Sequence, residues 1–224
     1  MDKHLFLFGG GPPFPPKLAE RFSQLAKKKE GAVSILCLER EGWIDYMPNY
    51  TKALEENGIT IFRYLPLPTT SESEVIERLH ESTGVIIGGG DTSRYADYIV
   101  DTPISDAIRT SYIQGVPVAG FSAGALISPK RCVISPKDNV DKQLQIRKGL
   151  GLIEDLVIAV HFSEWGEEGH LRNTANKLRG YQYFGIDEMN GMYFVNERLE
   201  EIDGSGVYRL EEEKLVNIST IEKR

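Results

Sequence analysis

The residues best suited to chemistry lie around a serine between two glycines. The segment GFSAGA (120–125) directly follows the apolar run VPVA (116–119). The pattern G-x-S-x-G is typical of a sharp turn from a strand into a helix that exposes a nucleophile, here Ser122. Gly120 and Gly124 suit such a turn because side chains there would clash with the neighbouring strand and helix. An ordinary strand-to-helix turn can show the same residues, so the motif needs partners.

A serine hydroxyl is a weak nucleophile and requires a neighbouring base. Three of the four histidines occur where a surface or packing role is expected: His4, His80 and His170. His161 differs, because it directly follows the apolar run LVIAV (156–160), at the end of a predicted strand. Ligands of open α/β sheets bind where strands end. We therefore expect His161 to lie beside Ser122 as its base.

A third residue should orient the histidine and stabilise its charged form. The segment GIDEMNG (185–191) ends a later predicted strand with two carboxylates, Asp187 and Glu188. Successive side chains of a strand point to opposite faces, so only one of them can face the histidine. This acid gives the chain order serine, histidine, acid. The order of an α/β-hydrolase would instead require an acid such as Asp138 or Glu154.

Backbone amides near the serine could hold the oxyanion of a tetrahedral intermediate. Ala123 begins the predicted helix, where N–H groups have no helical acceptor. The segment GGGDT (88–92) follows another predicted strand, and the amide of Gly89 or Gly90 could complete the oxyanion hole. Two other roles fit these glycines: a phosphate-binding turn or a tight turn before a helix. A further glycine-rich segment, GGGPP (9–13), follows the first predicted strand.

The elements that must position these residues alternate along the chain. Strands are predicted at seven apolar runs: 4–8, 32–38, 59–65, 84–88, 116–121, 156–160 and 183–187. Helices are predicted where apolar residues recur every three or four positions: 16–29, 50–58, 72–83 and 92–115. Strands that are apolar on both faces and separated by helices predict a doubly wound, mostly parallel α/β sheet with helices on both faces.

The tail has a different pattern, with strand-like stretches on both sides of DGSG (203–206). This pattern predicts C-terminal antiparallel strands at an edge of the sheet.

The sequence has no internal repeat, low-complexity tract or linker, so we expect one domain over residues 1–224. Tyr95, Tyr98 and Ile99 could face a homodimer interface or the core, and we expect the core.

Composition limits the function classes. The formal net charge of −7 argues against nucleic acid or an anionic membrane surface as the main partner. No apolar run approaches the roughly 18 residues that a membrane span requires. Two cysteines, Cys37 and Cys132, fit a reducing cytoplasm and are expected to be buried and unreactive. No spacing suggests a metal site, so we expect neither metal nor organic cofactor.

Four segments together resemble one known family. IIGGGDTSRY, GFSAGA, HFSEWG and GIDE, in this order and spacing, are similar to the serine peptidases that include aspartyl dipeptidase (peptidase E) and cyanophycinase. The resemblance covers roughly residues 30 to 195. It implies a fold like that of class I glutamine amidotransferases, with serine in place of their cysteine nucleophile. It also implies Ser122 as nucleophile, His161 as base and Glu188 as orienting acid, with Asp187 as the fallback. The oxyanion hole would use the amides of Ala123 and of Gly89 or Gly90.

The chain departs from this family where substrate is bound. Cyanophycinase-like members tend to carry arginines soon after the HFS histidine, whereas here the stretch is acidic and Arg172 is the first basic residue. An acidic substrate side chain requires a cation in its pocket. Arg94 is the substrate-binding candidate, with Lys130 and Arg131 as alternatives. Asp138, in SPKDNVD, is the candidate for a substrate-contacting acid that the resemblance suggests.

These observations predict a cytoplasmic serine peptidase that cleaves small peptides, with dipeptides carrying N-terminal aspartate suggested by the family. Two alternatives stay open. An esterase or amidase would use the same three residues on a different acyl group. A non-catalytic protein of the same fold would bind a small anion through GGGDT and the helix that begins at Ala123, but binding alone needs no serine, histidine and acid together.

Overall fold

Five adjacent parallel strands form most of the main sheet in the computed structural model, which describes residues 1–219. The sheet has seven strands in the order β11-β10-β1-β5-β4-β2-β3. The parallel strands are β1 (His4–Phe8), β2 (Ala32–Leu38), β3 (Phe62–Leu67), β4 (Ser82–Ile87) and β5 (Val118–Phe121). Two antiparallel strands extend the edge beside β1, namely β10 (Gly191–Val195) and β11 (Arg198–Asp203).

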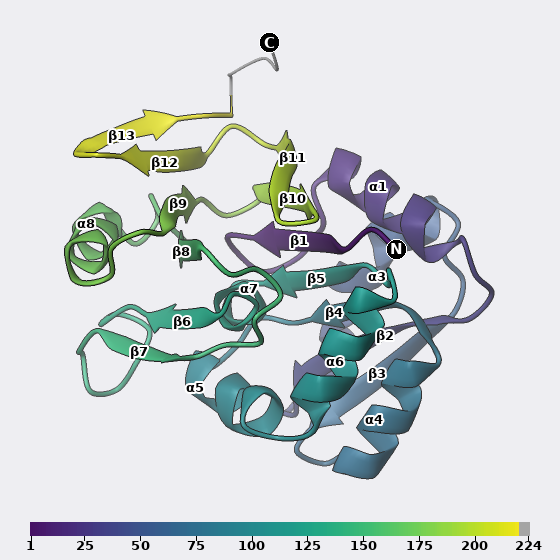
Figure 1. Ribbon diagram of the computed structural model, residues 1–224. Coiled ribbons are helices and arrows are strands. Elements are labelled where there is room, and N and C mark those ends of the chain that lie inside the picture. The colour runs from purple at the N-terminus through teal and green to yellow at the C-terminus, as the bar shows by residue number, and fades with distance from the viewer. Residues whose placement is uncertain (220–224) are drawn as a thin grey trace.

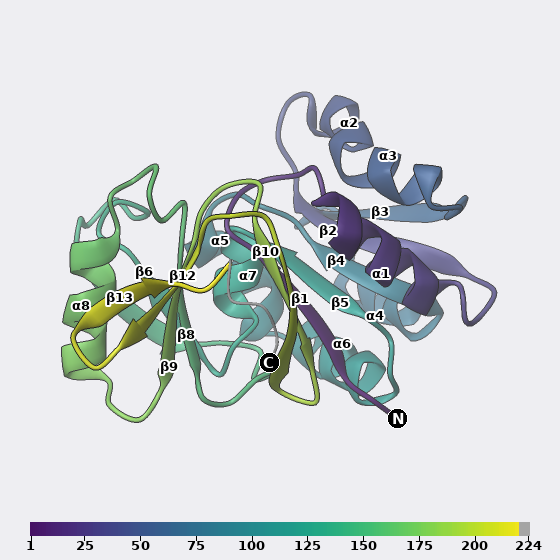
Figure 2. The same cartoon turned by 90° about the horizontal axis from the view of Figure 1, so that it is seen from above.

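Helices cover both faces of this sheet (Figures 1 and 2). Side chains of β1 alternate between two apolar clusters, with Leu5 and Leu7 in one and Phe6 and Phe8 in the other. The phenylalanine face packs against α1 (Pro16–Ala26) and α3 (Pro48–Glu56), and the leucine face against α4 (Glu72–His80) and α6 (Ile104–Ile113). The doubly wound α/β fold predicted from the sequence is therefore confirmed.

A second sheet stands beside the main one, in the order β13-β12-β9-β8 (Figure 1). Its strands are β8 (Leu156–Val160), β9 (Gln182–Ile186), β12 (Val207–Glu211) and β13 (Lys214–Asn217), and α8 (Glu168–Lys177) connects β8 to β9. The last two predicted parallel strands thus pair with each other here instead of joining the main sheet. β6 (Arg131–Ile134) and β7 (Gln145–Lys148) form a separate antiparallel pair.

The predicted C-terminal antiparallel strands are present, but the strands on the two sides of DGSG do not pair with each other. β11 and β12 flank this segment and belong to different sheets, so DGSG is the crossing between the sheets. The predicted single domain over 1–224 includes residues 220–224, which lie outside the described residues.

The long helix predicted over 92–115 is interrupted. It divides into α5 (Thr92–Tyr95), a π-helical turn η1 (Ala96–Val100) and α6, with Pro103 before the last. A proline disfavours helical backbone in the residue that precedes it, so the break falls there. Two short helices complete the fold, α2 (Trp43–Tyr46) and α7 (Ala123–Ile127). Within residues 1–219 no helix is both long enough and apolar enough to cross a membrane.

Candidate active site

The nucleophile turn forms at the carboxyl end of β5. Ser122 follows Phe121 directly and adopts φ 47°, a strained conformation for a residue other than glycine. A Cβ atom on Gly120 would overlap the backbone of Gly124, and one on Gly124 would overlap the carbonyl of Ile87. The two glycines are therefore required by close backbone approach, as the sequence predicted.

A chain of hydrogen bonds connects the three residues that the motifs singled out. Ser122 Oγ lies 2.8 Å from His161 Nε2, and His161 Nδ1 lies 2.7 Å from Glu188 Oε1. In the tautomer that fits this chain, the hydroxyl donates to Nε2 and Nδ1–H donates to the carboxylate. The His161 side chain is 13% exposed and that of Glu188 is 49% exposed. This arrangement can move a proton from serine to histidine while the acid stabilises the resulting charge.

The base and the acid come from the second sheet. His161 follows β8 and Glu188 follows β9, whereas Ser122 belongs to the main sheet. Like Ser122, His161 has φ 47°. The expectation that serine and histidine end strands of one sheet was wrong, yet the carboxyl ends of β5 and β8 lie close enough to bring both residues together.

The other acids considered from the sequence have different partners. Asp187 Oδ1 accepts a hydrogen bond of 2.8 Å from the amide of Ser163, so this residue fixes the loop after His161. Glu154 pairs with Lys130 on the surface. Asp138 Oδ2 accepts a 2.6 Å hydrogen bond from Thr92 Oγ1. Burial raises the pKa of the Asp138 carboxyl, and the bond from Thr92 opposes that shift.

The glycine segment after β4 lies against the nucleophile. A Cβ on Gly89 would lie 3.6 Å from Ser122 Cβ, so this backbone faces the serine. The amide of Gly89 donates a 2.9 Å hydrogen bond to the buried hydroxyl of Tyr50. Gly90 has φ 150°, a conformation that favours glycine. The Ala123 amide, first in α7, has no acceptor within the helix.

Asp91 shows that the same segment also starts a helix. Its side chain accepts a 2.9 Å hydrogen bond from the amide of Arg94 and caps the N-terminus of α5. The tight turn before a helix and the loop facing the serine are therefore both present in GGGDT, since one follows the other along the chain.

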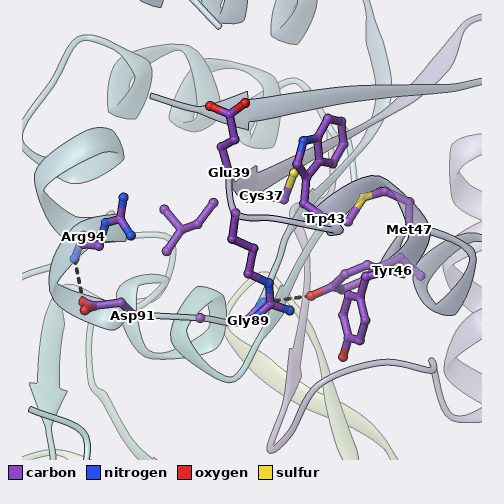
Figure 3. Close-up of a pocket in the computed structure, with 12 residues that line it drawn as sticks. Cys37, Glu39, Trp43, Tyr46, Met47, Gly89, Asp91 and Arg94 are labelled. Carbon is purple, nitrogen blue, oxygen red and sulfur yellow. Dashed lines mark hydrogen bonds between the residues drawn. The ribbon is translucent and has the colours of Figure 1, made fainter. Parts of the chain in front are cut away.

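A cavity of about 220 Å³ opens beside Gly89 and Gly90 (Figure 3). Its lining is partly aromatic and apolar and partly charged: Cys37, Leu38, Glu39, Arg40, Trp43, Tyr46, Met47, Tyr50, Gly89, Gly90, Asp91 and Arg94. In Figure 3, Trp43, Tyr46 and Met47 lie on one side of the cavity, and Asp91 and Arg94 lie on the other. The size suits one amino-acid side chain or a small residue.

Of the three basic residues considered for substrate binding, one lines this cavity and two lie on the surface. Arg94 lines the cavity, whereas Lys130 is held by its surface carboxylate and Arg131 is exposed on β6. Arg40, which the sequence reasoning missed, lies on the cavity wall. Within residues 1–219 neither Arg40 nor Arg94 forms a side-chain ion pair, and each guanidinium lies near a tyrosine ring instead.

Two further residues near the triad were also missed. No sequence signal indicates a role for Tyr50, because a single tyrosine in a helical segment has the pattern of an ordinary core residue. Trp165 lies within the HFSEWG motif, and its ring stacks on the imidazole of His161.

The two thiols, Cys37 and Cys132, are free and buried as predicted, and burial raises the pKa of each to about 12.

Cyanophycinases are similar in sequence to this chain. The cyanophycinase of Trichormus variabilis is 26% identical over 164 residues, which cover 70% of this chain and 55% of the relative. The cyanophycinase of Geminocystis herdmanii is 26% identical over 58% of this chain and 49% of its own length. The chain therefore matches about half the length of these relatives.

A solved structure described as a peptidase from an acI-B1 actinobacterium covers 97% of this chain and 95% of its own, with a TM-score of 0.74 and 20% identity. This likeness shows a shared fold. The family model for peptidase family S51 matches residues 20–219, which is most of the sequence and contains all three residues of the hydrogen-bonded chain. The chain belongs to peptidase family S51.

Proposed function

We propose that the chain is a serine peptidase that hydrolyses small peptides through Ser122, His161 and Glu188. The observation that carries this proposal is the continuous hydrogen-bonded chain from Ser122 Oγ through His161 to Glu188, with distances of 2.8 and 2.7 Å. The strained nucleophile turn supports it, because such strain is retained at functional sites. Membership of a peptidase family supports the choice of an amide as the cleaved bond.

The geometry suits a reaction in two stages. Ser122 Oγ attacks the carbonyl carbon while His161 Nε2 takes its proton, and the carbonyl oxygen becomes the oxyanion. The amides of Ala123 and Gly90 are the candidate donors to this oxyanion, because the Gly89 amide already donates to the Tyr50 hydroxyl. His161 then gives the proton to the leaving amine. Water, deprotonated by His161, releases the acyl group and restores the serine hydroxyl.

The direction of the substrate follows from these roles. Because His161 protonates the leaving amine, that half of the peptide must lie beside the histidine. The acyl half then extends past Gly89 and Gly90, toward the cavity that holds Arg40 and Arg94. Two guanidinium groups that form no ion pair in the described part of the chain favour an acidic side chain before the cleaved bond. We therefore include peptides with N-terminal aspartate in the proposal, although Glu39 and Asp91 line the same cavity.

A panel of dipeptides tests both parts. Asp-Xaa, Glu-Xaa, β-Asp-Arg and neutral dipeptides are incubated with the wild type and with Ser122→Ala, and products are measured by mass spectrometry. We expect acidic dipeptides to be cleaved by the wild type alone. Cleavage restricted to neutral members would keep the serine mechanism and reject the acidic pocket.

Two further measurements distinguish the alternatives, which are an esterase or amidase and a non-catalytic protein that binds a small anion. Hydrolysis of carboxylic esters without any peptide cleavage would favour an esterase. Folded protein that cleaves nothing and does not react with a fluorophosphonate at Ser122 would reject every enzymatic reading, and would leave binding of a small anion.

A further inference from the structure

The indole of Trp165 covers one face of the His161 imidazole. The ring centroids lie 4.3 Å apart and the ring planes differ by 15°, which is a stacked arrangement. Both nitrogens of His161 are already engaged, Nε2 with Ser122 and Nδ1 with Glu188. With both nitrogens held, the imidazole can still tilt about the axis that runs through Nδ1 and Nε2. The stacked indole of Trp165 restricts this tilt.

The turn that carries Trp165 is held from both sides. The Trp165 amide donates a 2.8 Å hydrogen bond to the carbonyl of His161, and Gly166, with φ 61°, makes the turn that follows. Lys137 reaches across from the connection between β6 and β7. Its Nζ donates to the carbonyl of Trp165 and lies 3.5 Å from the carbonyl oxygen of Gly166.

The Glu167 carboxylate also stabilises the observed position of the Lys137 side chain. The Glu167 side chain is only 2% exposed, and neither carboxylate oxygen has a hydrogen-bond partner within residues 1–219. Lys137 Nζ lies 3.6 Å from its Oε1. A buried carboxylate is costly without a nearby cation, so moving Lys137 away would also leave this charge uncompensated. The carboxylate therefore favours the position in which Lys137 holds the Trp165 carbonyl.

The stacked ring can also act on the charge of His161. In the first stage of hydrolysis the imidazole gains a proton, and an aromatic face stabilises a cation placed against it. Glu188 stabilises the same cation, but solvent reaches about half of its side chain and weakens that interaction. Two further carboxylates lie near His161. Glu164, in the Trp165 loop, accepts a hydrogen bond from the Glu188 amide, and Asp138 lies in the connection between β6 and β7.

We propose that Trp165 is a positioning residue that fixes the tilt of the His161 ring and stabilises its protonated form, and that Lys137 holds the turn that presents it. This inference rests on the proposed hydrolysis and adds two residues to it. Neither residue touches the reacting atoms, since both act through His161.

Activity against pH provides the first test, on the best dipeptide substrate. Removing the indole in Trp165→Leu makes the protonated form of His161 less stable, so the base form persists to lower pH. We expect the acidic limb of the kcat/KM profile to move down by roughly 0.5 to 1 pH unit, and kcat to fall about three- to tenfold with little change in KM. Trp165→Phe keeps an aromatic face and should lie between wild type and Trp165→Leu.

Lys137 is tested with a matched control. Lys137→Met should reproduce the shifted acidic limb of Trp165→Leu, and Lys137→Arg, which keeps a donor and a charge, should restore it. Lys214→Met makes the same change at an exposed residue of β13 and should leave the profile unchanged. If Lys137→Met does not fold, the arginine and tryptophan variants still decide the result.

A measurement without substrate separates this inference from the proposed function. The ring signals of 13C-labelled histidine are followed against pH, with that of His161 assigned by its loss in His161→Gln. We expect its midpoint to lie roughly 0.5 to 1 pH unit lower in Trp165→Leu than in the wild type. Equal midpoints would overturn the inference even in an active enzyme. A shifted midpoint in a protein that cleaves nothing would support the stacking and reject the peptidase.

Discussion

Glu188→Gln removes the negative charge of the acid while keeping an oxygen that can accept from His161 Nδ1. The charge lies 2.7 Å from the nitrogen on which it acts. At that separation, Coulomb attraction to a protonated imidazole is about 1.5 kcal/mol in water and about 6 kcal/mol at an effective dielectric constant of about 20. The carboxylate is half exposed, so we expect about 2 to 4 kcal/mol, which corresponds to a loss in kcat of roughly 30- to 1,000-fold.

This expected loss is smaller than the ~10⁴-fold effect of neutralising the buried acid of a serine-protease triad, because solvent screens Glu188. The assay is the steady-state hydrolysis of the best dipeptide, with thermal unfolding measured on the same samples. We expect the melting temperature of Glu188→Gln to stay close to that of the wild type, since an exposed carboxylate adds little stability.

Asp187→Asn is the matched control, because the adjacent carboxylate bonds to a backbone amide instead of the histidine. We expect this variant to lose stability more than kcat. Activity of Glu188→Gln within threefold of the wild type, together with a large loss of kcat in Asp187→Asn, would refute the assignment of Glu188 and make Asp187 the acid.

Three further changes test the parts around the triad. Gly9→Ala should cost activity and lower the melting temperature, because the new Cβ would overlap the carbonyl of Ile186 between the two sheets. Tyr50→Phe frees the Gly89 amide and should lower kcat about tenfold by loosening that loop, with a stability loss of about 1 kcal/mol by urea titration. Burial lowers the pKa of His4 in the folded protein, whereas the same imidazole in the unfolded chain is protonated near pH 6.5. The free energy of unfolding should therefore fall as the pH drops through 6.5. His4→Gln should reduce that slope in urea titrations at pH 5 to 8.

Features encoded by short segments were predictable from the sequence. The alternation of apolar runs and helical periods is local, and it predicted the five parallel strands and the helices on both faces. The nucleophile turn was predictable because only glycine tolerates the close backbone approach at positions 120 and 124. The same locality led to errors, since the break at Pro103 lay inside a segment of continuous helical period.

Features that depend on pairing between distant segments were not predictable. The apolar runs of β8 and β9 look like those of the main sheet, because a strand buried on both faces has the same composition in either sheet. Likewise, nothing in the order of residues shows that Lys137 reaches the turn of Trp165, or that Tyr50 meets Gly89. Such contacts join segments far apart along the chain, and only the fold selects them.

The division into two sheets has a direct consequence for the site, because nucleophile and base must be aligned across the junction. The end of β1 supplies that alignment through two consecutive carbonyls. The Phe8 carbonyl accepts a 3.0 Å hydrogen bond from the amide of Ser122, and the Gly9 carbonyl accepts one of 2.7 Å from the amide of His161. One short piece of backbone thus fixes both residues from opposite sides. Glycine is required at position 9 for this close approach, because a Cβ atom there would overlap the carbonyl oxygens of Ile186 and Asp187.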